Sequence, residues 1–180
     1  AIVYGLTHAL QVRFVGTTGQ GPYSDIAIDD VTIMGQDDCI LPTPAPTTSP
    51  LPTTFHPTPV PTADRLLACD FDSSTCGFEY TGDHDWIHRT GAAESNWRNT
   101  GPSGDHTSGT GYYMYVYAYG GWPDYTYNYP HVGPFTLASP SFSECVGEVR
   151  FYYHMHGSNM GALELEQTAA VSYTKHRAHE

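Results

Sequence analysis

A proline-rich segment divides the chain into two pieces and limits what it can fold into. Between residues 41 and 63, eight prolines alternate with threonine and serine. Because proline fixes φ and lacks a backbone donor, no strand ladder can run through this segment. We expect a disordered Pro/Thr-rich, mucin-like linker over residues 40–64, either a bare spacer or a carrier of O-glycans. The folded body must therefore come from the segments on either side.

The two flanking segments have the composition of strands joined by turns. Aromatic residues make up 13% of the chain, with 14 tyrosines, and glycine and proline are abundant. Such a composition favours an all-β fold over long helices. Runs of β-forming residues predict strands at residues 10–15, 26–33, 112–119, 149–156 and 161–166. The apolar alternation changes phase at Asp29–Asp30, which indicates a β-bulge. After Glu166 no period remains, and we expect residues 167–180 to form a frayed tail of unknown role.

The net charge and the cysteine content limit which cellular compartments and which classes of binding partner suit this chain. The net charge of −12 argues against nucleic acid and anionic membrane surfaces as partners. No apolar run approaches the roughly 20 residues of a transmembrane helix. The four cysteines contain no CxxC pair, so disulfides in an oxidising compartment are the better interpretation. We expect an extracellular or cell-surface location, secreted or as part of an ectodomain.

Several motifs together resemble one known family. They are Thr100-Gly101-Pro102, Asp105-His106-Thr107, Gly111-Tyr112-Tyr113-Met114-Tyr115 and Ile26-Ala27-Ile28-Asp29-Asp30. In this combination the chain resembles the MAM family, an extracellular module named after meprin, the A5 antigen and receptor tyrosine phosphatase mu. The motifs stand in inverted order, because a domain end precedes a domain beginning. The resemblance therefore implies the C-terminal part of a first MAM-like domain at residues 1–39 and the N-terminal part of a second at residues 65–166.

The resemblance also implies the fold, a jelly-roll-like antiparallel β-sandwich. It would be incomplete, because the middle strands of the two copies would lie before Ala1 and after Glu166. Either segment alone leaves strand edges and an apolar face uncovered, which is costly and favours aggregation. We therefore expect residues 10–39 to pack against residues 69–166 as strands of one sandwich, in the manner of a permuted domain.

Disulfide pairing follows from the same resemblance, since the family joins its first two cysteines and its last two. Carried over, Cys69 pairs with Cys76. Cys39 and Cys145 would each pair with a cysteine outside this sequence, or with each other if the two segments form one domain.

A structural calcium site is implied where the segments meet. The candidate ligands are Asp70, Asp72, Asp105, Asp29 and Asp30. Hard cations such as Ca²⁺ take several carboxylate and carbonyl oxygens. The alternative is that these carboxylates accept hydrogen bonds from the backbone of turns and caps.

Catalytic chemistry has little support in the sequence. His154 and His156 would share one face of a strand and could begin a zinc site, but there is no HExxH motif. Asp83 and Asp85 could serve acid–base chemistry, but no nucleophile motif lies beside them. We therefore expect a protein that is not an enzyme.

Binding is expected at an aromatic loop, because exposed aromatic residues on loops are common in interfaces. Trp122, Tyr125 and Tyr127 follow Gly120-Gly121 in such a loop. The resemblance implies a non-catalytic extracellular interaction or adhesion module from a tandem MAM-domain protein. Its partners would be other extracellular proteins, including homophilic ones. The alternative is an accessory domain of a secreted or membrane-bound enzyme, such as a metalloprotease or a receptor phosphatase.

Overall fold

In its described parts the chain forms strands joined by turns and loops. The computed structural model describes residues 2–4, 9–19, 23–36, 64–81, 86–93, 100–118, 133–169 and 173–177. The strands are β1 (Ile2–Tyr4), β2 (Ala9–Thr17), β3 (Asp25–Gln36), β4 (Arg65–Cys69), β5 (Glu79–Thr81), β6 (Ile87–Thr90), β7 (Tyr112–Val116), β8 (Phe135–Ala138), β9 (Cys145–His156), β10 (Ala162–Ala169) and β11 (Tyr173–Arg177).

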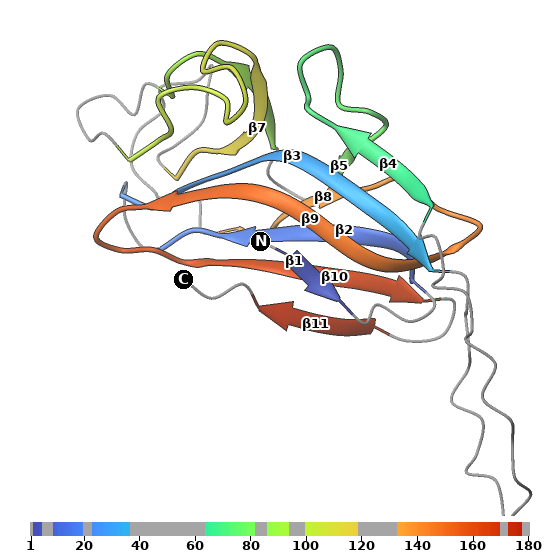
Figure 1. Cartoon of the computed structure of the whole chain (residues 1–180). Helices are drawn as coiled ribbons and strands as arrows, with labels where there is room; N and C mark the ends of the chain where they lie inside the picture. Colours follow the sequence, from blue (N-terminus) through green and yellow to red (C-terminus); the bar gives the residue numbers. More distant parts are fainter. Residues whose placement is uncertain are drawn as a thin grey trace, which may run out of the picture.

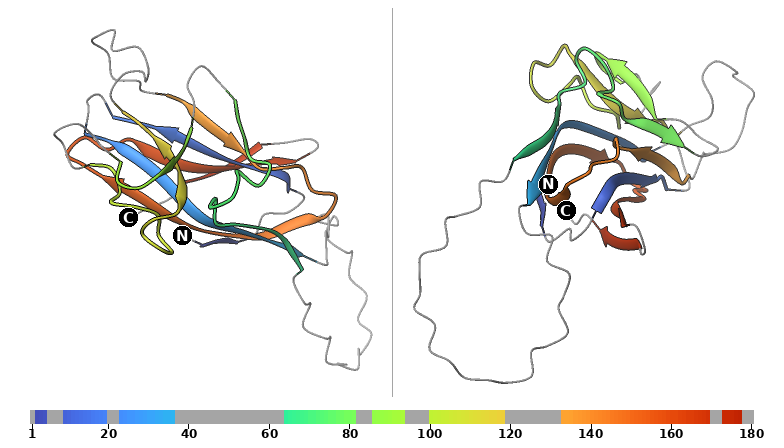
Figure 2. Two further views of the ribbon diagram at one scale, coloured as in Figure 1. Left: turned by 90° about the horizontal axis from the view of Figure 1, so that it is seen from above. Right: turned by 90° about the vertical axis from the view of Figure 1, so that its right-hand side faces the viewer.

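These strands form two antiparallel sheets that pack face to face (Figures 1 and 2). The first sheet has the order β1-β9-β3-β7-β6, with β4 also paired to β3. The second sheet has the order β11-β10-β2-β8-β5. The architecture confirms the expected all-β sandwich.

The N-terminal segment supplies one interior strand to each sheet. In the first sheet β3 lies between β9 on one side and β7 with β4 on the other, and Ile28 stands opposite Tyr153 of β9. In the second sheet β2 lies between β10 and β8, and Phe14 stands opposite Leu165 of β10. The prediction that residues 10–39 and 69–166 share one sandwich is therefore confirmed for the described strands.

A bulge at Asp29–Asp30 divides the pairing of β3. The register with β9 shifts between Asp29 and Thr32, and Asp30 has a φ of 48°. Before the bulge β3 pairs with β7, and after it β3 pairs with β4. The change of phase in the sequence predicted this bulge. Its extra residue bends the strand, and one edge of β3 then serves two partners.

The core joins the two chain segments. Its members include Phe14, Ile26, Ile28, Trp86, Phe151 and Leu163, all buried. A second, smaller buried cluster contains Ala27, Ala93, Tyr113 and Tyr115. It places apolar side chains of β3 and β7 under the loop that follows β6, so this sheet is covered on part of its second face as well.

The end of the chain differs from the prediction of a frayed tail. β10 continues to Ala169, and β11 pairs with it antiparallel, with Leu165 opposite His176. An edge strand needs only a backbone partner, so it can form without an alternating apolar pattern. The described residues contain no helix long and apolar enough to cross a membrane.

The disulfide pairing is confirmed where the structure describes both cysteines. Cys69 and Cys76 are bonded, with Cα atoms 5.9 Å apart. Cys145 is also disulfide-bonded and stands opposite Gln36 of β3. Cys39 and residues 40–63 of the predicted linker 40–64 lie outside the described residues, so the Cys39–Cys145 bond and the disorder of the linker stay predictions. The ends that flank the linker lie side by side, because Gly35 N–H donates to Asp64 O at 2.6 Å.

Candidate functional site

A buried aspartate at the start of β3 anchors both ends of the segment 100–118. Asp25 is fully buried. Its Oδ2 accepts a hydrogen bond from Thr100 Oγ1 at 2.7 Å, and its Oδ1 accepts one from Ala118 N–H at 3.1 Å. A buried carboxylate is tolerated only when donors surround it, so these contacts fix where the segment begins and ends.

Two further aspartates at the bulge hold the middle of this segment. Asp29 Oδ2 accepts from His106 N–H at 2.7 Å. Asp30 Oδ2 accepts from Thr107 Oγ1 at 2.6 Å and lies 2.7 Å from His106 Nδ1. Because the bulge breaks the alternation of side chains along β3, Asp29 and Asp30 both face the same loop.

Burial changes the acidity of Asp29. Desolvation raises the pKa of Asp29 to about 6, against the lowering effect of the His106 and Asp30 backbone donors, while the carboxylates of Asp30 and Asp105 raise it further. Keeping Asp29 ionised in the folded chain therefore costs free energy.

Asp105 organises the turn that follows. Its Oδ1 accepts from Gly111 N–H at 2.6 Å and its Oδ2 from Ser108 N–H at 2.8 Å. Burial by itself would raise the pKa of Asp105, but these donors outweigh it and the pKa lies below its ordinary value. Asp72 Oδ1 accepts from Tyr112 N–H at 2.8 Å, beside Gly111. A Cβ at Gly111 would come within 1.9 Å of that Asp72 oxygen, so only glycine fits there.

The five predicted calcium ligands fall in this region, but they are engaged with protein donors. Asp29, Asp30, Asp72 and Asp105 contact the segment 105–112, and Asp70 Oδ1 accepts from Asp72 N–H. Among the residues that the structure describes, no group of three or more His, Cys, Asp or Glu side chains is arranged to hold a metal ion. This arrangement fits the alternative, carboxylates that cap turns, and calcium binding stays a prediction.

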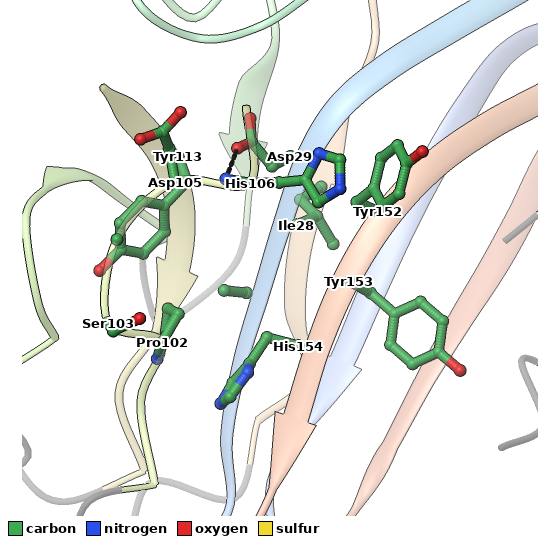
Figure 3. A pocket seen from close by; sticks show the side chains of 12 residues that line it. Ile28, Asp29, Pro102, Ser103, Asp105, His106, Tyr113, Tyr152, Tyr153 and His154 are labelled. Carbon is green, nitrogen blue, oxygen red and sulfur yellow. Dashed lines mark hydrogen bonds between the residues drawn. The ribbon is translucent and has the colours of Figure 1, made fainter. Parts of the chain in front are cut away.

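A groove of about 290 Å³ opens between the segment 102–106 and strands β3 and β9. Figure 3 shows Tyr113 and Pro102 along one side, His106 and Tyr152 along the other, and His154 at one end. Ala27, Ile28 and Asp29 of β3 also line it. Its volume is close to the lower limit of small-ligand pockets, about 300 Å³.

Aromatic rings dominate the exposed wall of this groove. The rings of His106 and Tyr152 are stacked, with centroids 3.4 Å apart and planes 18° from parallel. Tyr152 is 53% exposed although it stands on β9 beside the interior strand β3. His154, two residues further along β9, is fixed by a 2.9 Å hydrogen bond between its Nε2 and Thr100 O. The site can therefore offer ring faces to a ligand.

Comparison with known proteins identifies the family. The model of the MAM domain, meprin/A5/mu, matches residues 69–178. The chain belongs to the MAM family. The match reaches past Glu166 and includes β10 and β11, in agreement with the strands observed there.

Relatives with curated names carry the same module within much longer chains. Thyroid hormone-induced protein B of Xenopus laevis is 34% identical over 102 residues, covering 56% of this chain and 14% of that protein. MAM domain-containing protein 2 of Mus musculus is 36% identical over 103 residues, covering 54% and 13%. Neuropilin-1a of Danio rerio is 34% identical over 114 residues, covering 59% and 11%. No solved structure gives a significant match.

Histidines of this MAM chain do not form a zinc site in its described parts. The rings of His154 and His156 are 6.2 Å apart, and His154 is bonded to Thr100 O. His88 Nε2 lies 2.7 Å from Phe71 O. His154 and His88 serve as hydrogen-bonding partners of backbone carbonyls.

The other predicted site residues of the MAM chain lie outside the described residues. These are Trp122, Tyr125 and Tyr127 of the aromatic loop, and the carboxylates Asp83 and Asp85. Sequence reasoning missed Asp25 and the exposed Tyr152. Asp25 and Asp29 are four residues apart on a strand, which places both on one face, and that spacing was the signal available for Asp25. Tyr152 gave no signal, because it stands within a run of β-forming residues.

Proposed function

We propose that the chain is an extracellular, non-catalytic protein-interaction module of the adhesion type. The observation that carries this proposal is membership of the MAM family together with a surface groove walled by exposed aromatic rings. The Cys69–Cys76 disulfide supports an oxidising compartment. Aromatic residues partly open to solvent are enriched at protein interfaces.

The parent protein, in this proposal, contains further MAM copies. The chain spans only 11% to 14% of the length of the three relatives named above. The order of the family motifs reads residues 1–39 as a domain end and residues 65–166 as a domain beginning, and this order supports a tandem arrangement. A flanking catalytic domain would instead make this module the accessory part of an enzyme, so sequencing the parent protein separates the two.

Bead aggregation tests the interaction function directly. Beads coated with the intact chain are mixed with each other and, separately, with cells whose surface proteins are intact. We expect aggregation with one another or binding to cells, above the level of beads coated with the reduced and alkylated chain. Equal behaviour of the two bead types in both assays would contradict the proposal.

A further inference from the structure

The groove between segment 102–106 and strands β3 and β9 has the features of a site for a planar cation. Tyr152 and His106 present a stacked pair of rings, and Tyr113 lines the opposite side (Figure 3). The negative face of an aromatic ring attracts a cation placed over it, most often a guanidinium. A ring-walled groove near the minimum pocket size suits one side chain rather than a whole cofactor.

The negative charge in the groove favours a positively charged ligand over a neutral planar ligand. Asp29 and Asp105 line the groove, and both are at least nine-tenths buried, so their field acts through a medium of low dielectric constant. No lysine or arginine among the described residues lines it. Arg150, two residues before Tyr152 on β9, is paired with Glu148, and Arg89 donates to Ala92 O. Arg89 also interacts with Tyr113 and lies over the Tyr115 ring, behind the wall of the groove. The groove therefore has negative charge and ring faces, with no lysine or arginine among its lining residues.

We propose that this groove receives an arginine side chain of a partner protein. Arginine fits better than lysine because its guanidinium is planar, stacks on rings and is weakly hydrated. The inference deepens the proposed interaction function and rests on it for the identity of the partner as a protein. Tyr152 is the principal contact: His106 covers one face of its ring, and 53% of the residue remains open to solvent, so the other face can receive the guanidinium.

NMR titration of the full chain with N-acetyl-arginine amide tests this site. We expect saturable shifts of the Ala27, Ser103 and His106 amide resonances, with a Kd on the order of 1 mM, as suits a single side chain. N-acetyl-citrulline amide has the same shape without the charge. Its Kd should be at least about fivefold higher than that of the arginine compound. Equal binding of citrulline, or no shift at these amides with arginine, would overturn the proposal.

Variants separate the groove from the general acidity of the chain. Tyr152→Leu should weaken arginine binding about fivefold, and Tyr152→Phe, which keeps the ring, should restore it. The matched control is Tyr80→Leu, because Tyr80 is also 53% exposed but stands on β5 in the other sheet. Unchanged binding in Tyr152→Leu, with an otherwise preserved amide spectrum, would overturn the proposal.

The same variants in the bead assay distinguish the two proposals. If the beads still adhere but the arginine amide does not bind, the interaction function is supported and the groove is not an arginine site. Arginine binding without any adhesion keeps the groove and removes the interaction function. We expect Tyr152→Leu to lose both and Tyr80→Leu to keep both.

Discussion

Phe14 of β2 and Phe151 of β9 meet edge to face across the two sheets, with ring centroids 4.9 Å apart. Phe14 belongs to the segment before the linker and Phe151 to the segment after it, and both are buried. The contact therefore links the two sheets of the sandwich and also the two chain segments on either side of the linker. It means that the two pieces of the chain share one core and should unfold as one body.

Phe14→Ala should therefore destabilise both segments together. Deleting a buried phenylalanine ring costs about 3–5 kcal/mol, because the apolar contact is lost and a cavity remains. Urea unfolding followed by tryptophan fluorescence measures the loss, and amide exchange reports whether β3 and β9 lose protection at the same free energy. Tyr80→Ala is the control, since Tyr80 is 53% exposed and should change stability by less than about 0.5 kcal/mol. If the amides of β9 stayed protected from exchange after those of β3 had lost protection, the chain would not be a single cooperative body.

Cys39 should be bonded to Cys145 in the oxidised chain. Gln36, three residues before Cys39, stands opposite Cys145, and Cys145 is itself disulfide-bonded. Three residues of chain can bring two Cα atoms to the roughly 4.4–6.8 Å that a disulfide requires. Proteolysis without reduction, followed by mass spectrometry, should recover a peptide pair containing these two cysteines. A peptide joining Cys145 to Cys76 would contradict this pairing and the Cys69–Cys76 bond together.

Much of the fold could be predicted because its signals are local. The alternation of residues 10–15 and 161–166 predicted β2 and β10, and the phase change at Asp29–Asp30 predicted the bulge. β11 could not be predicted, because residues 173–177 lack an apolar alternation and pair with β10 through the backbone. Such an edge strand becomes visible only when its partner is in place.

The groove could not be predicted, because its walls come from distant parts of the chain. Asp29 and His106 are 77 residues apart, and Tyr152 comes from a third element. No local pattern states which loop will lie over which strand. The motif Asp105-His106-Thr107 marked the loop as distinctive, but its contact with β3 depends on the register of the whole sheet.

The predicted calcium site should make the chain more stable in calcium than in EDTA. The carboxylates of Asp29, Asp30, Asp72 and Asp105 accept hydrogen bonds from backbone or hydroxyl donors, but each oxygen has two lone pairs and can also ligate a metal ion. The same Tm in calcium and in EDTA would contradict the site. Calcium that raises Tm by several degrees, with the rise abolished in Asp72→Asn, would establish the metal site that the sequence predicted.

Asp29 should make the chain more stable as the pH falls through about 6. Burial raises the pKa of Asp29 from 3.8 to about 6, so between these values the folded state binds more protons than the unfolded state. Stability linked to a raised carboxyl pKa is lost as pH rises through the folded pKa, and regained on acidification. Lowering the pH from about 7 to about 5 should add about 1 kcal/mol from this group.

Asp29→Asn isolates that contribution. Asparagine has one acceptor oxygen where Asp29 accepts from both His106 N–H and Asp30 N–H, so the variant should be less stable at neutral pH. It cannot titrate, so its free energy of unfolding should lack the increase that the wild-type chain gains on acidification. Urea midpoints at a series of pH values measure the difference between the two proteins. A difference that stays constant across that range would show that Asp29 keeps an ordinary pKa and that segment 100–111 does not bury it in solution.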